Sequence, residues 1–263
     1  MPSTEAPDPQ PGDAYVQSFA RGLAVLRSFG ADAPAQTLTE AAERTGLTRA
    51  AARRILLTLV QLGYVAHDGK WFRLTPRVLE LGFAYLTSLP LWQQAQPAME
   101  ALVETVQESC SAAVLDGAEI VYVLRVQARR ILSLSLGVGS RLPAHCTAMG
   151  RVLLAGQPEA QWRGLLDAMP RHAATPRTLT DVDRLLDVLA QVRRQGWSLV
   201  DEELEQGLVT LAAPVHDRAG QVVAAINVSG QRSRRTPTQM RQELLPPLLA
   251  AAAEVSALLR AHA

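Results

Sequence analysis

Residues Leu38 to Leu74 read LTEAAERTGLTRAAARRILLTLVQLGYVAHDGKWFRL, and this stretch decides the fold of the first part of the chain. Thr39 is placed to cap a short helix, the run Thr45 to Leu47 predicts a tight turn, and Thr48 is placed to cap a second helix. Gly63 stands where a glycine commonly ends a helix. The second helix has apolar residues at helical spacing, namely Ile55, Leu56, Leu59 and Leu62.

A β-hairpin is predicted directly after these two helices. Tyr64 to His67 and Lys70 to Leu74 are two β-prone runs, and Asp68-Gly69 between them is typical of a two-residue hairpin turn. Two helices joined by a tight turn and followed by a hairpin have the order of a winged helix, which is a module that binds duplex DNA.

The second helix carries only basic charges. Arg49, Arg53 and Arg54 lie between Thr48 and Leu62, where no acidic residue occurs. Arg49 and Arg53 are four residues apart and share a face, and guanidinium groups suit phosphate oxygens and guanine edges in a major groove. The alternative is an ordinary solvated helix face, because Lys70 is the single lysine among the 26 Lys and Arg residues. A winged helix used only for protein contacts is a further alternative.

The composition allows two domains of ordinary size. The chain has 263 residues and a net charge of +1, so its basic character is local and fits one DNA-binding module attached to a neutral domain. Two cysteines, Cys110 and Cys146, give no disulfide framework and no ligand spacing for a metal, and they fit a reducing cytoplasm. We expect no transmembrane segment, no signal peptide, no metal site and no cofactor.

Four segments are expected along the chain. A helix that begins at Ser18 places Phe19, Leu23, Leu26 and Phe29 on one stripe, and we expect that stripe to pack under the helix-turn-helix. Thr75-Pro76 predicts the start of a linker helix. The expected organisation is a disordered proline-rich leader (1–14), a winged helix-turn-helix (15–75), a linker helix (76–90) and an effector and oligomerisation domain (91–263).

The periodicity changes at Cys110, after which strands and helices are both predicted. Strands and helices in such groups favour an α+β domain with one mostly antiparallel sheet. The predicted strands are Ser111 to Leu115, Glu119 to Val126, Ile131 to Leu136, Val209 to His216 and Gln221 to Ser229, and the predicted helices are Thr147 to Ala155, Glu159 to Met169, Asp181 to Gln195 and Gln239 to Ala261.

Residues 15 to 260 resemble the IclR family of bacterial transcription regulators. The stretches that carry the resemblance are SFARGLAVL (18–26), the winged-helix region 38–74, TPRVLELG (75–82), GSRLPAHCTAMGRVLLA (139–155), the motifs between Gln195 and Val215, and AINVSG (225–230). This resemblance implies a GAF-like second domain and a dimer, or a tetramer built from dimers, that binds an inverted-repeat operator.

A narrower resemblance links the chain to the β-ketoadipate-pathway branch of that family, the PcaR, PcaU and PobR type. It rests on YVQSFARGL (15–23), on RV (125–126) followed by RRI (129–131), and on SRLPAHCTAMGR (140–151). The branch implies an aromatic-acid catabolite as effector, such as protocatechuate, 4-hydroxybenzoate or β-ketoadipate. The alternative is an IclR-type regulator of another pathway with an aliphatic-acid effector.

Seven residues are predicted to contact DNA. Thr48, Arg49, Arg53 and Arg54 are expected to contact bases or phosphates from the second helix. The expected contacts to backbone phosphates come from Arg21, Lys70 and Arg73.

An effector with a carboxylate needs a cation or several hydrogen-bond donors in a partly apolar cleft. Arg141 is the first candidate for the cation, with Arg125 and Arg130 behind it, and His145 is a candidate partner for a phenol or carboxylate. Each of three candidates also has an ordinary structural explanation. Arg141 could be a loop residue that covers the sheet, Arg125 could form a surface ion pair, and His145 could be a loop residue whose hydrogen bonds are made within the protein. The resemblance implies further pocket positions. Thr147 and Ala148 lie at the start of a short helix, where free amides favour an anion, and Asn227 and Ser229 lie on one face of a strand. Thr210 matches another pocket position, and Asp201 matches a further one to within one residue.

A thiol enzyme is the remaining alternative. Cys146 lies beside His145 in the sequence, but neighbouring residues rarely bring both side chains together, and a cysteine nucleophile requires a lowered pKa. We therefore expect no catalytic residue and a regulator rather than an enzyme.

Overall fold

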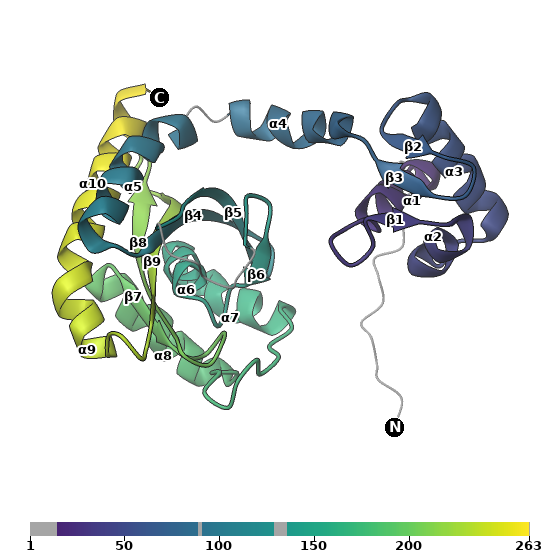
Figure 1. The fold of residues 1–263 in the computed structure, drawn as a ribbon. Helices are drawn as coiled ribbons and strands as arrows, with labels where there is room; N and C mark the ends of the chain where they lie inside the picture. Colours follow the sequence, from purple (N-terminus) through teal and green to yellow (C-terminus); the bar gives the residue numbers. More distant parts are fainter. Residues whose placement is uncertain (1–14, 89–90, 129–135, 263) are drawn as a thin grey trace. The chain divides into compact units, whose positions relative to one another are not determined.

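The computed structural model describes residues 15–88, 91–128 and 136–262 (Figure 1). The chain divides into two compact units, Met1–Thr87 and Ser88–Ala263, which are described separately below. The predicted leader 1–14, Arg130 and most of the strand predicted from Ile131 lie outside the described residues. Among the described helices, none is both long enough and apolar enough to cross a membrane.

The first unit is a winged helix, as predicted. Its three strands form an antiparallel sheet in the order β1-β3-β2, and Leu56, Val65 and Phe72 belong to its core. Its elements are α1 (Gln17–Arg27), β1 (Ala35–Gln36), α2 (Leu38–Thr45), α3 (Arg49–Gln61), β2 (Val65–His67), β3 (Phe72–Leu74), the short 3-10 helix η1 (Pro76–Val78) and α4 (Leu79–Ser88).

Of the two central helices, α3 is capped by the predicted residue and α2 is not. Thr48 caps α3, and its side chain accepts a hydrogen bond from the amide of Ala51 at 3.2 Å, as predicted. The cap of α2 is Thr37 and not Thr39, because Thr37 and Glu40 exchange side-chain and backbone hydrogen bonds in a capping box.

The hairpin and the first helix also correct the sequence prediction. Four residues, 68–71, join β2 and β3 in place of a two-residue turn, because the Asp68 carboxylate accepts the amides of Lys70 and Trp71 at 3.3 and 2.8 Å. On α1, Phe19 is 68% exposed and Leu23 is 41% exposed, so the predicted apolar stripe packs against the core only near its C-terminal end.

The second unit is an α+β domain with one antiparallel sheet, as predicted. Its six strands are ordered β6-β5-β4-β9-β8-β7, and every pairing is antiparallel. The strands are β4 (Ser109–Asp116), β5 (Glu119–Val126), β6 (Arg141–Pro143), β7 (Ser198–Asp201), β8 (Leu208–His216) and β9 (Val222–Gln231).

Helices cover both faces of this sheet (Figure 1). The long helices α5 and α10 pack on one face, and α6 packs on the other with α7 and α8 outside it. The helices are α5 (Leu91–Val106), α6 (Ala148–Gly156), α7 (Glu159–Ala168), α8 (Val182–Gln195), α9 (Pro237–Gln239), the π-helical turn η2 (Met240–Leu244) and α10 (Leu245–His262).

Helix α6 approaches the sheet edge closely at its first turn. All residues of α6 from Ala148 to Ala155 are buried. A Cβ atom at Gly150 would lie 2.1 Å from the carbonyl oxygen of Ala144, so no larger residue fits there without a backbone shift. This close contact fixes the start of α6 against the segment that follows the edge strand β6.

Candidate ligand pocket and nucleic-acid interface

The second unit contains a cavity of about 310 Å³ between one face of the sheet and the start of α6. Residues paired across neighbouring strands point to the same face, so the register predicts which side chains form the floor. Thr210 pairs with Ser229, Ser229 with Ser109, and Asn227 with Ser111. All five of these polar residues line the cavity, where a sheet face under a helix is normally apolar.

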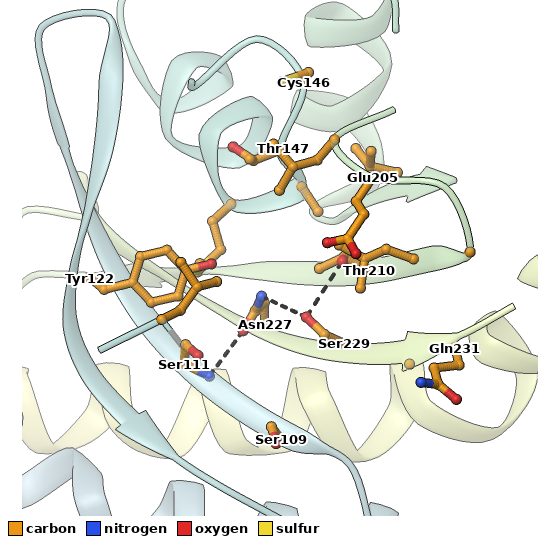
Figure 2. Close-up of a pocket in the computed structure, with 18 of the residues that line it drawn as sticks. Ser109, Ser111, Tyr122, Cys146, Thr147, Glu205, Thr210, Asn227, Ser229 and Gln231 are labelled. Atoms are coloured by element: carbon orange, nitrogen blue, oxygen red, sulfur yellow. Dashed lines mark hydrogen bonds between the residues drawn. The ribbon is translucent and has the colours of Figure 1, made fainter. Parts of the chain in front are cut away.

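Hydrogen bonds connect these floor residues to one another (Figure 2). The side-chain oxygen of Asn227 accepts the amide of Ser111 at 2.9 Å, and its Nδ2 donates to Ser229 Oγ at 3.2 Å. The hydroxyls of Ser229 and Thr210 are 3.5 Å apart. Asn227 therefore satisfies a backbone group and presents a polar surface to the cavity at the same time.

A bulge in β5 turns Arg125 into the same cavity. Ala112 pairs with Leu124 and Ala113 pairs with Tyr122, which leaves Val123 as the extra residue. Tyr122 and Arg125 are three residues apart and would face opposite sides of a regular strand, yet both line the cavity. The Nε atom of Arg125 is buried and has no hydrogen-bond partner among the described residues.

The Tyr122 hydroxyl and the start of α6 are two further features of the cavity that suit a ligand with a carboxylate and a second polar group. Burial raises the pKa of the Tyr122 hydroxyl to about 12, so this group remains a hydrogen-bond donor at neutral pH. Thr147 caps α6 by accepting the amide of Gly150 at 3.2 Å, and Thr147, Ala148 and Met149 line the cavity. The N-terminus of a helix carries free amides and a partial positive charge, which attract a carboxylate.

The loop from Leu204 to Leu208 forms another wall of the cavity. Glu202, just before it, has a left-handed backbone with φ of 58°, and its carboxylate accepts the amide of Gly207 at 2.7 Å. Figure 2 shows the side chain of Glu205 directed toward Thr210 from this loop.

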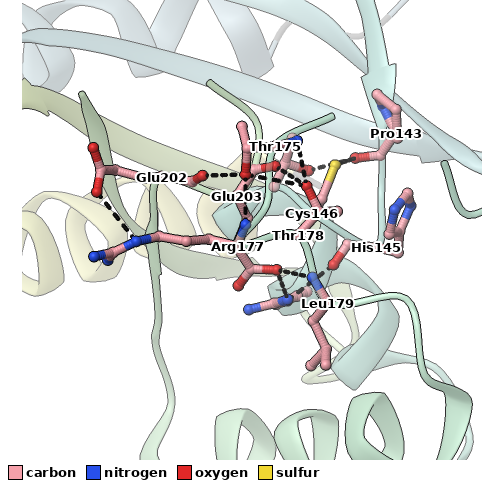
Figure 3. A network of polar contacts seen from close by, with 11 residues as sticks. Pro143, His145, Cys146, Thr175, Arg177, Thr178, Leu179, Glu202 and Glu203 are labelled. Atoms are coloured by element: carbon pink, nitrogen blue, oxygen red, sulfur yellow. Dashed lines mark hydrogen bonds and ion pairs between the residues drawn. The ribbon is translucent and has the colours of Figure 1, made fainter. Parts of the chain in front are cut away.

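An ion pair and several hydrogen bonds of Glu202 and Glu203 hold the segment that leads into this wall, and Figure 3 shows the network around these two residues. Arg151 Nη2 on α6 lies 2.6 Å from Glu203 Oε2, and the same oxygen accepts the amide of Leu179 at 2.8 Å. The hydroxyls of Thr175 and Thr178 donate to the carbonyl oxygens of Glu202 and Glu203, each at 2.6 Å. The pocket wall is therefore tied to both α6 and the 175–179 segment.

The structure brings six of the nine predicted effector residues to the cavity and places three elsewhere. Lining the cavity are Arg125, Thr147, Ala148, Thr210, Asn227 and Ser229. Arg141 does not line it, because it lies at the sheet edge in ion pairs with Asp116 at 2.7 Å and Glu119 at 2.6 Å.

His145 and Asp201 also lie outside the cavity wall. His145 is buried beside Arg151, whose Nε donates to the His145 carbonyl at 2.9 Å, and burial lowers the pKa of the imidazole. Asp201 forms ion pairs with Arg177 and Arg232. Val200 lines the cavity in its place, because successive residues of β7 point to opposite faces.

Sequence reasoning missed Ser109, Ser111, Tyr122 and Glu205, which all line the cavity. Ser109 and Ser111 are two residues apart, and the other residues of this strand up to Leu115 are apolar, so this spacing could have indicated a polar patch on one face.

Cys146 lines the cavity, but its environment disfavours nucleophilic chemistry. Burial raises the pKa of its thiol to about 11, so the thiol is protonated at neutral pH. Within the part of the chain that the structure describes, no three His, Cys, Asp or Glu side chains are grouped so as to hold a metal ion.

The predicted DNA-contacting residues lie on the surface of the first unit. Thr48, Arg49, Arg53 and Arg54 are exposed, while Ala52, Leu56 and Leu59 of the same helix are buried. No acidic side chain pairs with these three arginines in the described residues, whereas Arg73 pairs with Asp68 at 2.6 Å. Arg21 on α1 and Lys70 in the hairpin connection are also exposed.

Comparison with known sequences matches both units to one family. The IclR helix-turn-helix domain matches residues 18–69, and the C-terminal domain of bacterial transcriptional regulator IclR matches residues 83–257. The chain belongs to the IclR family. As an IclR-family protein it is a transcription regulator with a DNA-binding helix-turn-helix, as predicted.

Relatives of this IclR-family protein include regulators of the predicted branch. It is 44% identical to the Pca regulon regulatory protein of Pseudomonas putida, across 92% of this chain and 83% of the relative. It is 36% identical to the p-hydroxybenzoate hydroxylase transcriptional activator of Acinetobacter baylyi, across 89% and 88%. The predicted resemblance to the Pca and Pob regulators is confirmed.

Solved structures of IclR-type proteins also match. A transcriptional regulator from Rhodococcus sp. RHA1 has a TM-score of 0.83 and 47% identity, over 93% of this chain and 98% of that one. An IclR homologue from Microbacterium hydrocarbonoxydans, solved with 4-hydroxybenzoate, has a TM-score of 0.81 and 28% identity, over 93% and 99%.

Proposed function

We propose that this IclR-family regulator controls transcription in response to a small aromatic carboxylate bound in the pocket of its second unit. The observation that carries the proposal is the polar sheet face beside Arg125, whose buried Nε has no partner in the described residues. A ligand carboxylate would supply that partner, and the start of α6 would add amide donors. Relatives named for the Pca regulon and for p-hydroxybenzoate hydroxylase support an aromatic acid.

The proposed DNA-binding form is a homodimer, or a dimer of dimers, on an inverted-repeat operator in the cytoplasm. In this proposal residues 15–75 read DNA, residues 76–90 form the linker, and residues 91–263 bind the effector and assemble the oligomer. Thr48, Arg49, Arg53 and Arg54 contact bases or phosphates, with Arg21, Lys70 and Arg73 on the backbone. The pocket binds its ligand without turnover, and the protonated thiol of Cys146 supports this.

A thermal-shift titration tests the effector class. Purified full-length protein is titrated with 4-hydroxybenzoate, protocatechuate, β-ketoadipate, glyoxylate and pyruvate. A ligand that binds only the folded state stabilises it by about 2.7 kcal/mol at about 100 times its Kd. We expect an aromatic acid to raise the melting temperature, and Arg125→Gln to reduce that rise while the exposed control Arg163→Gln retains it.

Stabilisation by β-ketoadipate, glyoxylate or pyruvate, with no response to the aromatic acids, would contradict the proposal. It would assign the aliphatic class of effector to the same pocket.

A further inference from the structure

We propose that Glu205 determines ligand specificity, so that the pocket selects an aromatic monocarboxylate with a hydroxyl group at its far end and rejects dicarboxylates. This inference rests on the function proposed above, because it concerns the ligand of the same pocket. Its basis is the distribution of charge around the cavity.

The pocket has one charge of each sign among its described lining residues. Arg125 is the cation and lies on β5, while Glu205 is the anion and lies on the loop between β7 and β8. Figure 2 shows the Glu205 side chain directed toward Thr210, which is on β8. Strands β4 and β9 separate β5 from β8 in the sheet. The backbones of β5 and β8 are therefore three strand spacings, or about 14 Å, apart.

Glu205 differs from the other acids of its segment in having no compensating cation in the described structure. Asp201 and Glu202 both pair with Arg177 and Arg232, and these contacts lie away from the cavity. Glu203 pairs with Arg151. Three of the four acids between residues 201 and 205 are thus matched by arginines, and the fourth lines the pocket.

The chemistry of a carboxylate side chain sets which ligand group can face it. An ionised carboxylate only accepts hydrogen bonds, so a phenolic O–H of the ligand is a matching partner. A second ligand carboxylate in the same place would meet the like charge of Glu205, whose side chain is exposed at the rim of the cavity, and would gain no donor from it. Of the three effectors named for this branch, the two hydroxylated aromatic acids meet this condition and β-ketoadipate, a dicarboxylate, does not.

Calorimetric titration of the full-length protein tests this assignment. The ligands are 4-hydroxybenzoate, benzoate and 4-carboxybenzoate, which share one ring and one carboxylate and differ only at the far end. A site built to bind a hydroxyl group discriminates strongly against analogues that lack it. We expect 4-hydroxybenzoate to bind at least about tenfold more tightly than 4-carboxybenzoate to the wild type, because one lost or repelled polar contact in a pocket changes affinity by about that factor.

The variant Glu205→Gln keeps the shape of the side chain and removes its charge. We expect Glu205→Gln to reduce the ratio of the dissociation constants of 4-carboxybenzoate and 4-hydroxybenzoate by about tenfold. The main cause would be tighter binding of 4-carboxybenzoate, since an amide donates to a carboxylate. The matched control Glu104→Gln changes an acid on α5 that is exposed like Glu205 but does not line the cavity, and it should leave the ratio of the two dissociation constants as in the wild type.

The outcomes separate this inference from the proposed function. If 4-hydroxybenzoate binds but 4-carboxybenzoate binds equally well, or if Glu205→Gln leaves the ratio unchanged, the role of Glu205 is overturned and the aromatic effector class stands. If no aromatic acid binds the wild type, both the effector class and this inference are overturned.

Discussion

Arg151 shows how a single residue can connect the architecture of the second unit to its pocket. Its side chain is 4% exposed, and the carboxylate of Glu203 supplies its ion-pair partner at 2.6 Å. Because a buried charge is tolerated only with a partner of opposite sign, this contact fixes both α6 and the 202–208 turn. The pocket wall at Leu204 to Leu208 depends on a pair of residues that do not line the pocket themselves.

Removing the charge of Glu203 should therefore destabilise the second unit. We expect Glu203→Gln to lower the free energy of unfolding by about 3 kcal/mol, because Arg151 is left buried without a counter-charge. Urea denaturation followed by circular dichroism measures this change. The control is Asp183→Asn, which removes the partner of the exposed Arg163 and should change the free energy of unfolding much less, because water screens an exposed ion pair. Equal effects of the two substitutions would show that Glu203 does not stabilise the buried arginine.

Helix α3 is the element on which DNA recognition depends. Its buried residues Ala52, Leu56 and Leu59 hold it to the core and leave Arg49 and Arg53 on the opposite, solvent-facing side. Since their guanidinium groups have no acidic partner in the described structure, they are available to phosphates without breaking an ion pair.

Substitution of Arg53 tests this function of α3. We expect Arg53→Ala to weaken operator binding and to reduce the slope of log K against log salt by about 0.9, which is the change for one lost phosphate contact. Fluorescence anisotropy at several salt concentrations measures both quantities. Arg163→Ala, on α7 of the second unit, is the control and should leave the slope unchanged. If Arg53→Ala also leaves it unchanged, α3 does not contact the phosphates through this residue.

The sequence predicted these elements well wherever one local pattern decides the structure. Thr48 as the cap of α3 follows from side-chain types within a few residues, and so does the end of α8 at Gln195, which Gly196 follows. The capping box of Thr37 and Glu40 was also readable, because the two residues have the required spacing.

The positions of the pocket residues depend on information that one strand does not contain. The bulge at Val123 arises from the pairing of β5 with β4, so the sequence of β5 alone could not show that Arg125 faces the cavity. Arg141 is held by Asp116 and Glu119, which lie more than twenty residues away in the chain. Asp201 was predicted only to within one residue of a pocket position, and in a strand a difference of one residue exchanges one face for the other.

At the scale of the whole molecule, an exposed apolar face of the first unit supports the proposed dimer. Val16, Phe19 and Leu23 lie on one side of α1, and all three are exposed in the single chain. A cluster of exposed large apolar side chains is typical of an interaction surface. A second copy of the chain is the partner that an inverted-repeat operator requires.

We expect Phe19→Ser to shift the equilibrium toward monomer and to weaken binding to a full inverted repeat more than to a half-site. Sedimentation velocity over a concentration series measures the first effect, and anisotropy with the two DNA lengths measures the second. Val138→Ser removes an apolar side chain of similar exposure from the second unit and serves as the control. An unchanged monomer–dimer equilibrium in Phe19→Ser would place the dimer contact elsewhere.

The bulge in β5 also bears on how such a regulator could change its effector during evolution. Deleting one residue at Val123 would restore regular alternation and turn either Tyr122 or Arg125 out of the cavity. A single-codon deletion could therefore remove the guanidinium group of Arg125 from the cavity while every other pocket residue keeps its identity. Effector preference in this architecture can drift through changes of strand length as well as through substitutions, and comparisons that count only substitutions would overlook that route.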